Sequence, residues 1–80
     1  MSLRVLVDYN TTLEDSRGRV YINTNVQKEL LNHLIEAMPL TLYDYESLEV
    51  DAIAEFDEKE QQWYAIPDWS TRRDLPSLSD

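Results

Sequence analysis

Hydrophobic and polar residues alternate in several short runs of this chain, a pattern typical of β-strands with one buried face. The clearest run covers residues 48–56, in which the even-numbered positions are apolar and Glu49, Asp51 and Glu55 occupy the opposite face, broken only by Ile53. Weaker alternation predicts four further strands, at residues 4–9, 19–22, 40–45 and 62–66. We expect the strands at residues 4–9 and 19–22 to pair as a hairpin through a long polar loop. The strands at residues 48–56 and 62–66 should pair through a hairpin loop at residues 57–60.

Residues 24–38 show a helical period instead. Thr24 and Gln27 fit a capping box at the start of a helix. The apolar residues that follow fall on one side of such a helix: Leu30, Leu31, Leu34, Ile35 and Met38. Pro39 ends the segment, because proline forces the preceding residue out of the helical region. The pattern predicts an amphipathic helix with His33 on its exposed side.

The resulting element order, ββαβββ, predicts an α+β fold. One amphipathic helix would pack on a mostly antiparallel sheet of four to five strands, since hairpin connections place neighbouring strands antiparallel. A sheet curled strongly toward a small barrel is the alternative. The length of 80 residues indicates a single compact domain over residues 1–75, and Pro76 with the serine-rich end predicts a frayed tail at 76–80. We expect the chain from Trp69 onward to be irregular.

Charge and cysteine content narrow the classes of partner. The net charge is −9, and residues 41–68 carry nine acidic residues against Lys59 alone. Such a chain is repelled by phosphate backbones and anionic lipid, so we expect neither nucleic acid nor a membrane as partner. The chain has no cysteine, which excludes disulfides and favours a reducing compartment. Without a run of about 20 apolar residues or a signal peptide, the predicted location is cytoplasmic.

No motif with recognisable chemistry is present. A serine or threonine nucleophile needs a base within reach, and His33 is the sole histidine. Gly18 is the sole glycine, which argues against a phosphate-binding loop. The acidic run at 57–60 has neither the length nor the glycine of a calcium loop. We therefore predict no enzyme activity, no catalytic residues, no cofactor and no metal site.

The strand acids and the nearby aromatic residues form the candidate site. If acids and aromatic residues share the sheet face that the helix does not cover, that face would suit a protein partner, because tyrosine and tryptophan are enriched at interface hot spots. The predicted partner-binding residues are Glu49, Asp51, Glu55, Tyr64 and Trp69. The favoured function is a small acidic protein-interaction module or accessory subunit. The alternative is an inhibitor of a basic enzyme, such as an antitoxin, an immunity protein or a nucleic-acid mimic. The sequence leaves self-association open.

Overall fold

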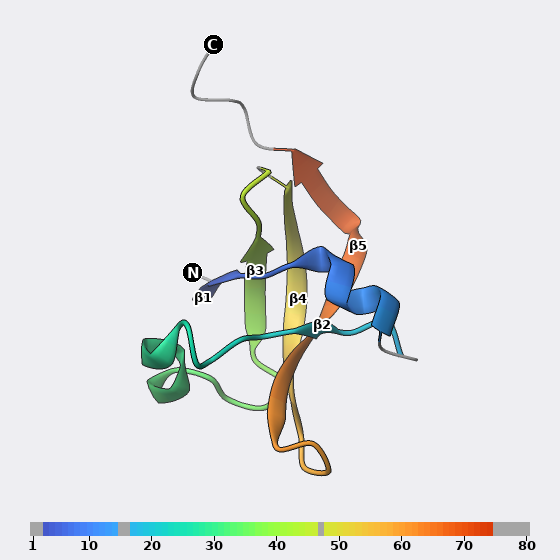
Figure 1. Ribbon diagram of the computed structural model, residues 1–80. Coiled ribbons are helices and arrows are strands. Elements are labelled where there is room, and N and C mark those ends of the chain that lie inside the picture. The colour runs from blue at the N-terminus through green and yellow to red at the C-terminus, as the bar shows by residue number, and fades with distance from the viewer. Residues whose placement is uncertain (1–2, 15–16, 47, 75–80) are drawn as a thin grey trace.

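The computed structural model describes residues 3–14, 17–46 and 48–74. The chain forms one curled, half-barrel sheet of five strands (Figure 1). The strands are β1 (Leu3–Leu6), β2 (Val20–Tyr21), β3 (Pro39–Tyr43), β4 (Leu48–Asp57) and β5 (Gln62–Asp74). Two short 3-10 helices, η1 (Tyr9–Glu14) and η2 (Lys28–Asn32), complete the described fold. None of the described helices is long and apolar enough to cross a bilayer.

The strand order is β1-β3-β4-β5-β2, so β1 and β2 lie at opposite edges of the sheet. β1 pairs with β3 in parallel, whereas β2 pairs with β5 antiparallel. The predicted hairpin of the first two strands is therefore wrong. The connection between them includes η1, which crosses in front of the sheet from one edge to the other (Figure 1). This path lets Val5 and Val20 enter the core from opposite edges.

The predicted amphipathic helix at residues 24–38 is also wrong, and with it the α+β class. The segment consists of turns around η2, and no described helix reaches seven residues. The backbone N of Leu34 donates to the carbonyl of Leu30 (2.9 Å) with the spacing of an α-helix, and both side chains are buried. Leu31, assigned to the same apolar stripe, is exposed.

The end of this segment is used to extend the sheet, which explains why the helix does not form. The backbone N of Ala37 donates to the carbonyl of Ala54, and the N of Ala54 donates to the carbonyl of Met38. Ala37 adopts a positive φ of 68°, which a helix excludes. The carboxylate of Glu36 accepts a further bond from the backbone N of Phe56 at 2.6 Å. A helix through Met38 would lose these bonds to β4, and an isolated helix of this length is marginal in water.

The core lies on the concave face of the sheet. β3 and β4 contribute Leu40, Leu42, Val50, Ala52 and Ala54, all buried. The alternation predicted for residues 48–56 is confirmed for these positions of β4. The small Ala54 of β4 and Ala65 of β5 lie opposite each other, and Val20 of β2 pairs with Ala65 from the next strand of the sheet.

β5 is longer than the sequence predicts. The strand continues through Pro67 to Asp74, so the expectation of irregular chain from Trp69 onward is wrong for residues 69–74. Proline is tolerated because β2 pairs only with Tyr64 and Ala65, which leaves β5 without a second neighbour at Pro67. A register shift between Glu49 and Asp51 marks a bulge in the pairing of β4 with β5. The predicted frayed tail at 76–80 lies outside the described residues.

Candidate functional site

Four of the five predicted partner-binding residues lie on the outer, convex face of the sheet. Along β4 the buried Val50, Ala52 and Ala54 point into the core, so the odd-numbered positions point outward. The register continues this face onto β5, where Glu55 is opposite Tyr64 and Glu49 is opposite Arg73. The structure thus places Glu49, Asp51, Glu55 and Tyr64 on one face of the sheet, with Glu49 and Asp51 toward one end of β4 and Glu55 and its partner Tyr64 toward the other.

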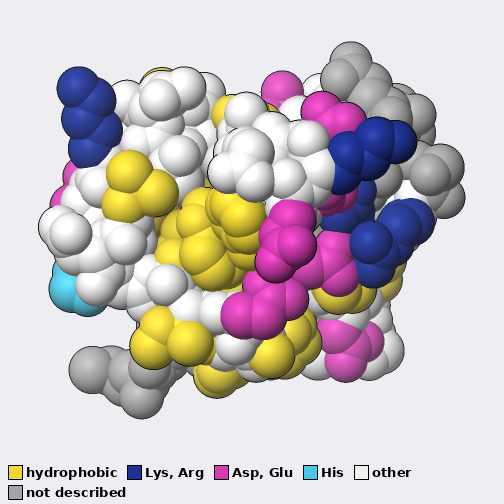
Figure 2. Space-filling view, turned by 90° about the horizontal axis from the view of Figure 1, so that it is seen from below, with side chains coloured by type: hydrophobic (Ala, Val, Ile, Leu, Met, Phe, Trp, Pro, Cys, Tyr) yellow, Lys and Arg dark blue, Asp and Glu magenta, His cyan; other side chains and the backbone are white. Residues whose placement is uncertain are grey.

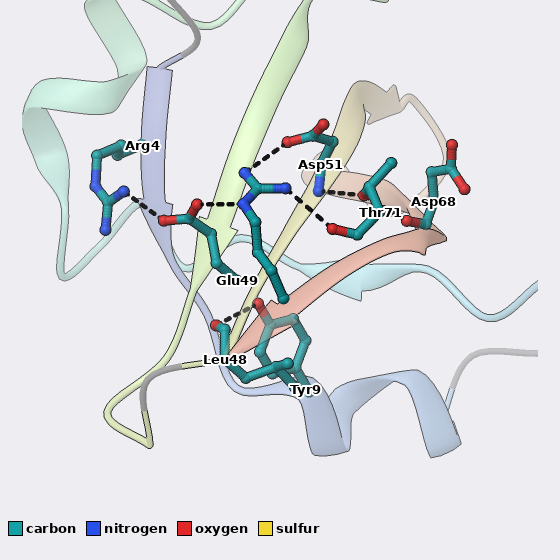
Figure 3. Close-up of polar contacts among 8 residues, drawn as sticks. Arg4, Tyr9, Leu48, Glu49, Asp51, Asp68 and Thr71 are labelled. Carbon is teal, nitrogen blue, oxygen red and sulfur yellow. Dashed lines mark hydrogen bonds and ion pairs between the residues drawn. The ribbon is translucent and has the colours of Figure 1, made fainter. Parts of the chain in front are cut away.

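Glu49 is the centre of an ion-pair cluster that joins three strands (Figure 3). One carboxylate oxygen accepts a bond from Arg4 Nη1 of β1 at 2.6 Å, and the other accepts a bond from Arg73 Nε of β5 at 2.7 Å. Arg73 Nη2 also donates to Asp51 at 2.9 Å. We call Arg4, Glu49, Asp51 and Arg73 the Glu49 cluster.

Glu49 is buried, and its ion pairs with Arg4 and Arg73 give it a role in holding the strands together. Only 7% of the residue is exposed. The hydrogen bond from Arg4, followed by that from Arg73, lowers the pKa of the Glu49 carboxyl below its usual value. The Arg4 guanidinium also lies 4.6 Å from the ring centre of Tyr43, a cation–π distance. Glu49 is therefore buried, although its alternation with the apolar residues of β4 places it on the outer face of the sheet.

A second cluster occupies the other end of β4. Arg19, which is buried, donates to Glu55 at 2.6 Å and to Asp57 at 3.1 Å, and Arg17 donates to Glu55 at 2.8 Å. The bond from Arg19 is the main cause that lowers the pKa of Glu55. Arg19 also lies 4.1 Å from the ring centre of Tyr64. We call Arg17, Arg19, Glu55 and Asp57 the Glu55 cluster.

The two clusters change the electrostatic picture of this face. Each contains two arginines and two carboxylates, so the formal charges cancel within each cluster. The sheet face is therefore less negative than the count of acids predicts. Figure 2, which views the molecule from the end below, likewise shows acidic side chains bordering a hydrophobic patch, with Lys and Arg beyond them.

Between the clusters lies a strip of apolar side chains. Ile53 of β4 pairs with Pro39 of β3 on one side and with Ile66 of β5 on the other. Ile53 is 43% exposed, Ile66 is 40% exposed and Pro39 is exposed. Three neighbouring strands thus present apolar surface at the same level of the sheet. We call these three residues the isoleucine strip.

Trp69, the fifth predicted residue, does not join this face. It follows Asp68 on β5, and its ring contacts Tyr9 of η1, with ring centres 5.5 Å apart. The hydroxyl of Tyr9 donates to the carbonyl of Leu48 at 3.0 Å (Figure 3). Burial, with Asp44 next, raises the pKa of Tyr9 to about 12. Trp69 remains 45% exposed, but beside η1 rather than beside the isoleucine strip.

A staple of polar bonds holds the bulge of β5 near the Glu49 cluster. The hydroxyl of Thr71 accepts a bond from the backbone N of Asp51 at 2.9 Å and donates to the carbonyl of Asp68 at 2.7 Å (Figure 3). In the described part of the chain, no group of three or more His, Cys, Asp or Glu could hold a metal ion. Glu49 and Asp51 form ion pairs with Arg4 and Arg73.

Sequence reasoning missed the arginines and the strip. Arg4 and Glu49 are 45 positions apart, and no local pattern joins them. Ile53 did interrupt the acidic face of residues 48–56, which was the available indication of an apolar position there. Comparisons with protein-family models, with curated proteins and with solved structures gave no match to this chain.

Proposed function

We propose that this protein is a non-enzymatic interaction module that binds another protein through the outer face of its sheet. The isoleucine strip would be the centre of the contact, and the two ion-pair clusters would form its border. The observation that carries the proposal is the in-register exposure of Ile53 and Ile66 on adjacent strands. An apolar centre within a polar border is the arrangement of many protein–protein interfaces.

The clusters support this role by fixing the shape of the surface. Arg4 and Arg73 connect β1 and β5 to the same carboxylate of β4, so these strands are cross-linked by charge. A surface that is already ordered loses less entropy on binding than a mobile one. Tyr64, held beneath Arg19, adds a fixed aromatic ring beside the strip.

Charge adds steering toward a partner with basic surface. The chain keeps a net charge of −9, and the acids of the β4–β5 turn, Glu58 and Glu60, are exposed. Such a field accelerates encounter with a cationic partner. Inhibition of a basic enzyme by mimicry of phosphates has less support, because Glu49 and Glu55 are ion-paired within the chain.

Site-specific photo-crosslinking in the native cell tests the proposal. A photoreactive phenylalanine analogue replaces Ile66 in one sample and the exposed Leu31 of η2 in a matched control. We expect one discrete protein adduct from position 66 that is lost when Ile53→Ser is added, and none of the same mass from position 31. Docking on the isoleucine strip would be refuted by adducts of equal yield from both positions. It would also be refuted if Ile53→Ser left the yield of the adduct from position 66 unchanged.

A further inference from the structure

A groove of about 630 Å³ lies away from the isoleucine strip. Three segments form its walls: the chain from the end of β1 into η1, the chain between β2 and η2, and the turn between β3 and β4. Pockets that hold ligands commonly measure about 300–1,000 Å³, so its size is sufficient for a side chain and its neighbours.

The charge of the groove has one sign. Its lining includes Asp8, Asp44 and Glu46 and contains no Lys, Arg or His. None of the ion pairs formed within the described residues involves these three carboxylates. They contrast with Glu49 and Glu55, whose charge is cancelled by arginine.

Three tyrosines share the lining with these acids. Tyr9 is fixed by its hydroxyl bond to Leu48, and Tyr21 by its hydroxyl bond to Gln62 at 3.1 Å. Tyr45, on the β3–β4 turn, is 89% exposed and has surface to cover an incoming group. Tyrosine faces attract cations, and the attraction adds to that of nearby carboxylates.

Hydrogen bonds within the chain hold the walls of the groove in place. The side chain of Gln27 donates to the carbonyl of Leu6 at 2.9 Å and accepts from the backbone N of Leu6 at 3.1 Å. This pair of bonds joins the end of β1 to the chain before η2 and satisfies the backbone of Leu6. On the β3–β4 turn, Asp44 accepts bonds from the backbone N atoms of Glu46 and Leu48, both at 3.0 Å. These bonds fix the positions of two of the three segments that line the groove and the shape of the third.

We propose that this groove binds a lysine or arginine side chain presented by an extended segment of a partner protein. Charge complementarity supplies the selectivity: a cation meets three carboxylates that no described arginine neutralises, while its aliphatic stem packs on the tyrosine rings. The site is separate from the isoleucine strip and does not rest on the function proposed for that strip.

Amide NMR titration of the whole chain tests the proposal with blocked tripeptides. Ala-Arg-Ala and Ala-Lys-Ala are compared with Ala-citrulline-Ala, in which arginine is replaced by its neutral analogue. We expect saturable shifts at the groove with the cationic peptides and none with the citrulline peptide. Glu46→Gln and Tyr45→Ala should each weaken binding about threefold or more, since exposed charges contribute modestly. Both side chains are exposed, so the variants keep the fold.

Glu58→Gln, on the β4–β5 turn, is the matched control because it removes an equal charge from an exposed residue outside the groove. It should leave the affinity unchanged. Three outcomes would overturn the proposal: equal weakening by Glu58→Gln, no groove shifts at about 10 mM peptide, or shifts with calcium chloride that match those with the peptides. The last outcome would identify a site for a simple divalent cation instead.

Discussion

Replacing Glu49 with glutamine should destabilise the fold far more than a typical surface substitution does. Glutamine keeps the size of the side chain but retains one acceptor oxygen, so one of the two arginines meets an amide NH₂ in place of a carboxylate oxygen. Hydrogen bonds to charged groups contribute about 1.5–3 kcal/mol, and breaking a fully buried pair costs about 3–5 kcal/mol. The Arg4 and Arg73 side chains are 53% and 42% exposed and can regain water. We therefore expect a loss of about 1.5–3 kcal/mol for Glu49→Gln.

Asp51→Asn is the matched control within the same cluster. Asp51 also accepts a bond from Arg73, but its side chain is 52% exposed, so the expected loss is under about 1 kcal/mol. Denaturant unfolding at pH 7 measures both values. In a domain of this size a loss of 2 kcal/mol corresponds to a fall in Tm of roughly 8–16 °C.

The difference in stability between the native chain and Glu49→Gln should also depend on pH. Because the arginines lower the pKa of Glu49 in the folded state, its contribution to stability is present above the unfolded pKa of about 4.3. It is lost as the pH falls through the lower folded pKa. The stability gap between the native chain and Glu49→Gln should therefore narrow steadily below about pH 4.3. A loss no greater than that of Asp51→Asn, or a gap that stays constant in acid, would refute the reasoning.

Three further predictions concern the core, a turn and an aromatic contact. Leu34→Ala should cost about 2–4 kcal/mol and His33→Ala under about 0.5 kcal/mol in denaturant melts, because the first is buried and the second exposed; a larger loss at His33 would contradict this. Gly18→Ala should cost about 1 kcal/mol, because Gly18 has a φ of +71° with no neighbouring atom to clash; an unchanged unfolding midpoint would argue against that conformation. Trp69 and Tyr9 should show a coupling energy of about 0.5–1.5 kcal/mol in a double-mutant cycle, and a coupling of zero would disprove the ring contact.

The sequence pattern predicted correctly those strands in which buried and outward-facing residues alternate regularly. β4 was predicted almost to its ends, because every second residue from Val50 to Ala54 is buried on the same face. The following hairpin to β5 was predicted from the polar run at 57–60, and the two strands do pair antiparallel.

The predicted helix at residues 24–38 does not form because the backbone groups at the end of the segment bond to β4. The periodic leucines are real, and Leu30 and Leu34 are buried, but the amide and carbonyl groups of residues 37–38 bond to Ala54. A pattern of side chains does not report a distant strand that offers backbone partners. The site failed in part for the same reason: Glu49 had the alternation of an exposed acid, yet arginines 45 positions before it and 24 after it bury its charge.

Affinity for the crosslinked partner, once it is identified, tests the central claim most directly. The measurement compares the dissociation constant of the native chain with those of Ile53→Ser/Ile66→Ser and of Leu31→Ser. If the isoleucine strip is the centre of the interface, the double variant should bind at least about tenfold more weakly, equivalent to 1.4 kcal/mol, while Leu31→Ser stays within about twofold, as expected outside a hot spot. A double variant that binds as tightly as the native chain, with its unfolding midpoint unchanged, would contradict the account.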